Sequence, residues 1–289
     1  IPKSILPRIR SSSEVYGHVR RRGPLPGVAI SGILGDQQAA AFGQACLAPG
    51  EAKISYGTGN SLLLNVGAEP AKPADGLIST VFYRLADEEP VYALEGSIAV
   101  TGLAVRWLRD NMGFFNSSDD IEALAAEVED NGGVYFVPAF SGIMAPRWRE
   151  DARGTIVGLT RFANRNHIAR AALEATAYQT REVAEAMRKQ ADVQLKTVKV
   201  DGGMTENKLL MQFQADMLNC PVVRGELREN ASLGTAYAAG LAVDFWSSTD
   251  EIRANWIPSD MWTPHMDQKT REELFHNWNK AVERSLNWA

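Results

Sequence analysis

Hydrophobic positions along the chain follow two periods, and these periods separate predicted strands from predicted helices. Two-residue alternation or a short apolar run predicts a strand, and Gly and Pro mark the turns. The predicted strands cover residues 28–35 (with its turn), 51–56, 60–67, 78–85, 90–96, 133–140, 196–200 and 221–224. The predicted helices cover residues 36–47, 98–112, 119–128, 166–190, 205–219, 231–242 and 269–287. Residues 1–27 are expected to be loop-rich.

The order of these elements predicts the fold class. A run of strands comes early, and strands then alternate with helices. This order predicts an α/β fold in which helices flank a mixed sheet. The pattern changes near residue 47, so we expect a domain boundary there, between residues 1–47 and residues 48–289.

Composition narrows the function. The net charge of -5 argues against general nucleic-acid binding, which needs a basic surface. The two cysteines, Cys46 and Cys220, lie far apart and are expected to be buried thiols in a reducing cytoplasm. The four histidines have no metal-ligand spacing, so no metal held by the protein alone is expected. No membrane span or signal peptide is indicated, and a start at Ile1 with no Met suggests that a longer chain precedes it.

The stretch GDQQAAAFG places Asp36 and Gln37 ahead of a run of very small residues. Taken alone, Asp36 is best interpreted as a helix N-cap, the commoner use of such a residue. It also suits a kinase that acts on an alcohol, because a carboxylate can accept the hydroxyl proton. Gln37 would then bond a second hydroxyl group.

Two glycine turns suit an anionic ligand. In YGTG, the glycines let backbone N–H groups approach a phosphate and Thr58 adds a hydroxyl, although an ordinary hairpin has the same pattern. In VDGGMTEN, a strand ends at Asp201-Gly202-Gly203 before a helix, a common way to seat a nucleotide. Close packing alone would also explain these glycines.

Longer motifs carry a family resemblance. The order of GDQQAAAFGQ, YGTGNSLLLNVG, YALEGS, WLRDNMGF, VYFVPAFSG, VDGGMTEN and SLGTAYAAGLAVDFW resembles the FGGY family of carbohydrate kinases, and within it the glycerol kinases. Residues 154–174 resemble the family's downstream signature: Gly-x-Ile-x-Gly-Leu, a seven-residue spacer, then His167-Ile168 and Ala171-Ala172-Leu173-Glu174. The resemblance covers nearly the whole chain.

The resemblance implies a fold and an activity. Residues 48–289 would form the C-terminal, nucleotide-binding lobe of a ribonuclease H-like, actin-like ATPase/sugar kinase fold. Residues 1–47 would be the end of the N-terminal, polyol-binding lobe, most of which is absent. The implied reaction is phosphorylation of glycerol to glycerol 3-phosphate by ATP with Mg²⁺ in the cytoplasm, and the chain alone is expected to be inactive. The oligomeric state stays open, a homodimer included.

The resemblance also implies site residues. Asp36 would be the catalytic base and would contact the polyol together with Gln37. The residues matched to nucleotide contacts are Thr58, Gly102, Gly203 and Asn207.

Three details depart from the family pattern. Asn60-Ser61 stands where glycerol kinases have Cys-Phe, which leaves room for a larger polyol. Arg106 replaces a common Gln near the nucleotide. The loop HVRRRGPLPG lacks the pattern that accompanies an allosteric sugar-phosphate site, so that regulation is not expected.

Two other interpretations remain. The acceptor could be another polyol or a ketose, given Ser61. The chain could instead be a nucleotide-binding or structural module of the actin-like kind, which the Asp36-Gln37 pair disfavours because such a module has no acceptor alcohol.

Overall fold

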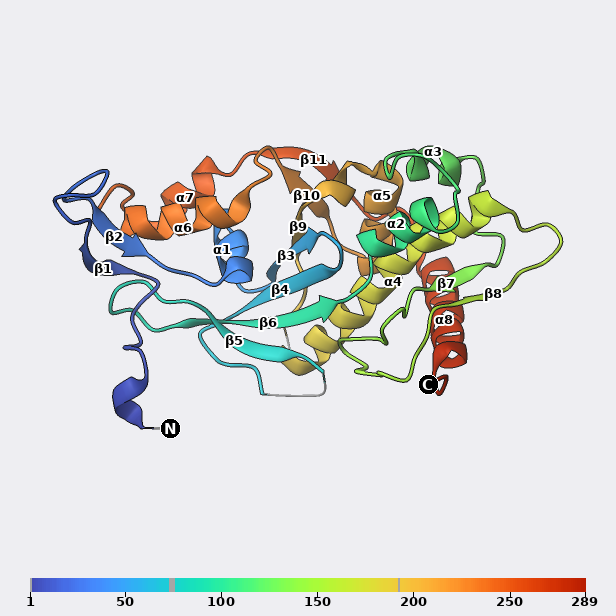
Figure 1. The fold of residues 1–289 in the computed structure, drawn as a ribbon, viewed down its shortest axis with the longest axis horizontal. Helices are drawn as coiled ribbons and strands as arrows, with labels where there is room; N and C mark the ends of the chain where they lie inside the picture. The colour runs from blue at the N-terminus through green and yellow to red at the C-terminus, as the bar shows by residue number, and fades with distance from the viewer. Residues whose placement is uncertain (1, 73–75, 192) are drawn as a thin grey trace.

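A mixed sheet runs through the middle of the molecule, with helices on both of its faces (Figure 1). The computed structural model describes residues 2–72, 76–191 and 193–289. Across these residues the sheet has seven strands in the order β11-β10-β9-β3-β4-β6-β5. Two ribbons of two strands, β1–β2 and β7–β8, lie outside it. The predicted α/β class, a mixed sheet flanked by helices, is confirmed.

The elements follow the predicted periods closely. The strands are β1 (Ser13–His18), β2 (Ala29–Gly32), β3 (Glu51–Tyr56), β4 (Asn60–Gly67), β5 (Ile78–Tyr83), β6 (Val91–Ile98), β7 (Tyr135–Val137), β8 (Thr155–Val157), β9 (Thr197–Asp201), β10 (Val222–Gly225) and β11 (Pro258–Trp262). The helices are α1 (Asp36–Gly43), α2 (Gly102–Asp110), α3 (Asp120–Ala126), α4 (Arg165–Ala191), α5 (Lys208–Leu218), α6 (Asn230–Leu241), α7 (Thr249–Asn255) and α8 (Gln268–Ser285). Short 3-10 turns cover Lys3–Ile5 and Gly203–Glu206.

The central strand β3 has a different environment on each side. Ala52, Ile54 and Tyr56 are buried in the larger hydrophobic core, which α4 and α5 share. Lys53 and Ser55 point to the opposite face, because successive side chains of a strand alternate. That second face is covered by α1 and α6, whose residues form a separate, smaller core. Strand β3 therefore separates an apolar layer from one that carries polar side chains.

Helices α1 and α6 pack with their backbones in contact. A Cβ atom added to Gly43 would lie 2.1 Å from the carbonyl oxygen of Asn230. A Cβ added to Gly234 would lie 1.9 Å from the carbonyl oxygen of Ala39. No larger residue fits at such a separation, which explains why GDQQAAAFG and SLGTAYAAG are poor in bulky side chains. The small residues are needed for helix packing.

The C-terminal end of α1 is held by a buried cation. Lys199 on β9 donates from Nζ to the carbonyl oxygens of Gln44, at 2.7 Å, and Ala45, at 3.0 Å. The ammonium group also lies 4.1 Å from the ring centroid of Trp256. A positive charge at this end complements the helix dipole.

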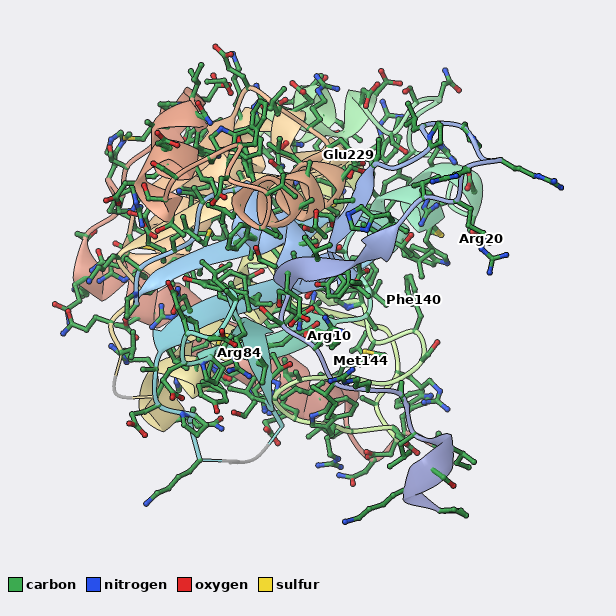
Figure 2. All side chains as sticks on the ribbon, turned by 90° about the vertical axis from the view of Figure 1, so that its left-hand side faces the viewer. Arg10, Arg20, Arg84, Phe140, Met144 and Glu229 are labelled. Atoms are coloured by element: carbon green, nitrogen blue, oxygen red, sulfur yellow. The ribbon has the colours of Figure 1, made fainter. Side chains whose placement is uncertain are left out.

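Several elements differ from the prediction. Residues 1–27 are not all loop, because β1 pairs antiparallel with β2, the next strand along the chain. The basic run at residues 20–22 lies between these two strands, and Arg20 projects outward into solvent (Figure 2). Strands β8 and β11 and helix α7 were not predicted, since β8 has three residues and β11 and α7 have few apolar ones. Helix α5 starts later than predicted because Asn207 has an extended backbone.

Both thiols are buried and free, as expected. Burial raises the pKa of Cys46 to about 12 and that of Cys220 to about 12. Within the described ranges, none of the helices has both the length and the hydropathy that a bilayer-spanning segment needs.

Replacing Gly234 by Ala should destabilise the fold. The new methyl group would clash with the Ala39 carbonyl oxygen, and overpacking of this kind costs about 1–3 kcal/mol. The gain in helix propensity, about 1 kcal/mol, does not offset a clash with rigid backbone. We expect the free energy of unfolding in urea to fall by about 1 kcal/mol, the cost of the clash less the gain in helix propensity. Gly17→Ala is the control, since no atom lies within 4 Å of its added Cβ; equal stability of the two variants would contradict the packing argument.

Candidate functional site

A cavity of about 660 Å³ opens where strand β3 ends. Its walls combine glycine turns, apolar side chains and a few charged groups. The lining residues are Tyr56, Gly57, Thr58, Gly102, Val105, Arg106, Ser118, Asp119, Ile121, Glu122, Leu173, Gly203, Met204, Glu206, Asn207 and Arg228. We call this cavity the glycine-turn pocket.

The turn between β3 and β4 is anchored on the start of helix α2. The carbonyl oxygen of Thr58 accepts N–H bonds from Thr101 and Leu103, both at 3.0 Å. The N–H of Gly102 donates to the Gly57 carbonyl oxygen at 3.2 Å. These bonds make the turn part of a rigid corner and place the N-terminus of α2 at the pocket, where its dipole favours an anion.

The glycines at this corner are required by close contacts. A Cβ added to Gly102 would lie 2.4 Å from the carbonyl oxygen of Gly57. A Cβ on Gly59 would lie 2.1 Å from the Ile98 carbonyl oxygen. Packing therefore explains these two glycines, and the same packing brings the backbone to the pocket wall.

The turn after strand β9 forms another wall. Gly202 has a φ of 94°, and a Cβ there would lie 2.1 Å from the carbonyl oxygen of Tyr56. Gly203 differs, because no atom lies within 4 Å of its added Cβ. Its missing side chain leaves open space in the pocket. Asn207 caps helix α5, its side-chain oxygen accepting the N–H of Leu210 at 2.8 Å.

The charged groups of the glycine-turn pocket are mostly paired. Arg106 donates from Nη2 to the hydroxyl oxygen of Thr58 at 2.6 Å. Arg228 pairs with Glu206 at 2.5 Å, and a hydrogen bond from Arg224 keeps the pKa of Glu206 below its usual range. The carboxylate of Glu122 accepts the N–H of Leu209 at 2.9 Å.

Asp36 lies outside the glycine-turn pocket and is exposed. The N-cap interpretation is wrong: Gly35 occupies that position, and α1 begins at Asp36 itself. One carboxylate oxygen accepts the backbone N–H of Gln37 at 2.8 Å. The other accepts the side-chain amide of Gln37 at 3.3 Å.

A buried lysine links this pair to strand β3. Lys53 is fully buried, and its Nζ donates to the side-chain oxygen of Gln37 and to the hydroxyl of Ser55, the latter at 3.0 Å. Burial lowers the pKa of Lys53, while the nearby carboxylates of Asp201 and Glu95 favour its charged form. Strand β3 thus contacts Asp36-Gln37 from one face and runs into the glycine-turn pocket at its end.

The carboxylate of Asp201 links the α1–α6 pair to the glycine-turn pocket. It accepts hydrogen bonds from the side-chain amides of Gln44, at 2.7 Å, and Asn230, at 3.0 Å. Gln44 follows α1 and Asn230 begins α6, while Asp201 immediately precedes the Gly202-Gly203 turn. The position of the α1–α6 pair is therefore coupled to a wall of the pocket.

The structure brings four of the six candidate residues together. Thr58, Gly102, Gly203 and Asn207 all line the glycine-turn pocket. Asp36 and Gln37 are adjacent to each other and reach the pocket region through Lys53 and strand β3. Their roles stay predictions.

Sequence reasoning missed Lys53, and it named Asp201 only as the end of a strand. A signal was available for the two lysines, because Lys53 and Lys199 each interrupt an apolar strand in the sequence. Their pairing across β3 and β9 is known only from the structure. A lysine on a strand whose neighbours are apolar is either exposed at a sheet face or buried with partners. Only the positions of α1 and α6 distinguish these cases.

Asn60 and Ser61, which stand where glycerol kinases have Cys-Phe, have different environments in the structure. Asn60 is buried, and its oxygen accepts the hydroxyl of Thr101 at 2.8 Å, so it supports the turn. Ser61 lies opposite Ser55 on the face that carries Lys53. It donates to a carboxylate oxygen of Glu95 at 3.2 Å.

Comparison with known proteins identifies the relatives of this fold and site. Residues 52–243 match the family described as "FGGY family of carbohydrate kinases, C-terminal domain". The whole chain is 62% identical to a glycerol kinase of Nocardia farcinica and 63% identical to one of Azorhizobium caulinodans. It spans 58% of the length of each. The crystal structure of Plasmodium falciparum glycerol kinase with ADP is similar over 98% of this chain and 57% of that one, with 40% identity and a TM-score of 0.94.

Proposed function

The chain belongs to the FGGY family of carbohydrate kinases, and from this premise we propose that its full-length protein uses ATP to phosphorylate glycerol. The products would be glycerol 3-phosphate and ADP. One observation carries the proposal: strand β3 contacts Asp36-Gln37 through Lys53 and ends in the pocket of Thr58, Gly102, Gly203 and Asn207. Since the chain spans 58% of its relatives' length, the activity is proposed for the whole protein.

The glycine-turn pocket fits a nucleotide. Its volume of about 660 Å³ lies within the usual range of about 300–1,000 Å³ for small-molecule sites. Val105, Ile121 and Leu173 offer an apolar wall for a base, while the glycine turns and helix N-termini suit phosphates. Gly203 leaves the space that a side chain would fill. When bound, ATP supplies the phosphoryl group.

Magnesium would be held with the phosphates of the nucleotide. Among the described residues, no group of three or more His, Cys, Asp or Glu side chains is arranged to hold a metal ion. Mg²⁺ usually keeps several waters and binds through one or two carboxylates and the substrate phosphates. This chain would therefore contribute to Mg²⁺ binding through one of the acidic side chains that line the glycine-turn pocket.

Asp36 would accept the proton of the acceptor hydroxyl. It is exposed, and its place at the start of α1 favours a negative charge there. Gln37 would bond a second hydroxyl through its remaining amide hydrogen. Removing the proton raises the nucleophilicity of the alcohol oxygen, and positioning supplies most of the remaining acceleration in phosphoryl transfer.

The setting would be a reducing cytoplasm. Both cysteines are buried free thiols rather than a disulfide, which supports this part of the proposal. We also propose that the full-length protein forms a homodimer, for which no interface is assigned.

A second candidate acceptor is a longer polyol or a ketose. Ser61 and Glu95 are hydrogen-bonded on the sheet face that carries Lys53, the partner of Gln37. Polar groups there would accept additional hydroxyl groups, where an aromatic ring would exclude them. An actin-like binding module without turnover is the alternative of a different class.

An ADP-release assay separates these alternatives. We expect the full-length protein to turn over glycerol, and residues 1–289 alone to give no turnover, because the chain spans 58% of its relatives' length. A panel of glycerol, four- and five-carbon polyols and ketoses measures kcat/KM for each acceptor. A higher kcat/KM for a five-carbon acceptor would replace glycerol as the proposed substrate. No turnover of the full-length protein on any acceptor would favour the actin-like binding module. Turnover by residues 1–289 alone would contradict their expected inactivity.

Asp36→Asn in the full-length protein should lower kcat by about 10²–10⁴, the usual contribution of a general base. The amide keeps the size of the side chain but cannot accept the proton. ADP affinity, measured by calorimetry, should stay unchanged because Asp36 does not line the glycine-turn pocket. Asp87→Asn changes another exposed carboxylate and serves as the control. A near-normal kcat in Asp36→Asn would exclude its role as the base.

Gly203→Val in the full-length protein should weaken ADP binding by about tenfold or more. The added side chain occupies open space in the pocket without a clash at its Cβ, and overlap with a ligand costs about 1–3 kcal/mol. Gly17→Val is the matched control, since its added Cβ also meets no atom within 4 Å. Unchanged ADP affinity in Gly203→Val would separate this pocket from the nucleotide.

A further inference from the structure

Lys53 is a buried charged residue whose hydrogen bonds go to neutral side chains. Its side chain is fully buried on the central strand β3, in a position where an apolar residue would normally pack. Placing an ammonium group there is costly unless its hydrogen bonds are satisfied. Two of its hydrogen bonds go to Gln37 and Ser55, and none that the structure describes goes directly to a carboxylate. The ammonium group of Lys53 therefore orients two neutral side chains, those of Gln37 and Ser55.

The contact with Lys53 determines how the Gln37 amide is turned. An ammonium group can only donate hydrogen bonds, so the side-chain oxygen of Gln37 must face it. The amide nitrogen then faces Asp36 and donates to its carboxylate at 3.3 Å. If the amide were flipped, its NH₂ group would meet the ammonium group and its oxygen would meet the carboxylate. Both contacts would be repulsive.

We propose that Lys53 is a positioning residue of the kinase reaction, acting on Asp36 and the acceptor alcohol through the side-chain amide of Gln37. This inference rests on the proposed function. One N–H of Gln37 is used to hold the Asp36 carboxylate. The other has no partner among the described residues and is available to a hydroxyl of the acceptor. Lys53 itself lies outside the glycine-turn pocket, so its effect should be confined to the acceptor side.

Lys199 provides an internal control. It is paired with Lys53 across neighbouring strands and points to the same face of the sheet. Its bonds go to the carbonyl oxygens of Gln44 and Ala45, at the other end of α1. Both lysines therefore hold the same helix, but only Lys53 contacts Gln37. A purely structural role would make the two lysines equivalent.

The first experiment is a double-mutant cycle on stability, which needs no catalysis. Lys53→Met fills the same volume with an apolar chain, a kind of exchange that buried charges often tolerate. In the full-length protein we expect Lys53→Met and Gln37→Ala to be coupled by a factor of about five in the unfolding equilibrium constant. Lys199→Met with Gln37→Ala should be additive within about a factor of two. If Lys53→Met does not fold, Lys53→Gln replaces it in the cycle.

The second experiment is the same cycle on turnover. We expect Lys53→Met to lower kcat by about 10²-fold, the loss typical of a misplaced reacting group. In the Gln37→Ala background the further loss should be only about twofold. ADP affinity should be unchanged, and Lys199→Met should lower kcat to the same extent with or without Gln37. This pattern would support positioning through the amide.

Two results would overturn the inference. Additive losses of kcat for Lys53 and Gln37 would mean that Lys53 does not act through the amide. Equal behaviour of Lys53→Met and Lys199→Met in both cycles would reduce Lys53 to a support of α1. Absence of any turnover in the unmodified full-length protein is a different failure, because it rejects the proposed function while the stability cycle still reports the Lys53–Gln37 contact.

Discussion

The backbone contact between α1 and α6 is the constraint on which the rest of the site depends. Gly43 and Gly234 let the two helices approach until backbone atoms touch, and a methyl group on either would collide with a carbonyl oxygen. The pair then lies on the sheet face that forms the smaller hydrophobic core, where Lys53 and Lys199 hold the two ends of α1. The position of Asp36 follows from this packing, because the described residues include no side-chain cap for α1.

Strand β3 connects the two halves of the proposed chemistry. Its alternation sends Ile54 and Tyr56 into the larger core and Lys53 and Ser55 towards α1. Its end runs into the turn that carries Thr58, on the N-terminus of α2. One element of six residues therefore supports both the alcohol side and the nucleotide side, and a shift of this strand by one residue would exchange its two faces. This geometry gives the charged residue at the centre of the sheet its hydrogen-bond partners.

Much of the architecture could be predicted from local patterns. The long strands and helices were found because their periods extend over many residues, and the family resemblance was carried by long motifs whose order is specific. The elements β1, α7 and β11 were not predicted, because SEVYGH, TDEIRAN and PSDMW contain too few apolar residues to show a period. Strand β8 has only three residues. The interpretation of Asp36 as a cap failed for a related reason: Gly35 and Asp36 are both compatible with a helix start, and the local sequence does not distinguish them.

By itself, the sequence determined the α/β class, the small residues of the two contacting helices and the candidates Asp36, Gln37, Thr58, Gly102, Gly203 and Asn207. These are properties of period and residue type, which are local. Only the tertiary structure decided that four of those residues share one pocket, that Lys53 is buried, and that it turns the amide of Gln37. Such facts depend on groups brought together from distant parts of the chain, and a lysine in a strand has the same local pattern whether water or a helix lies above it.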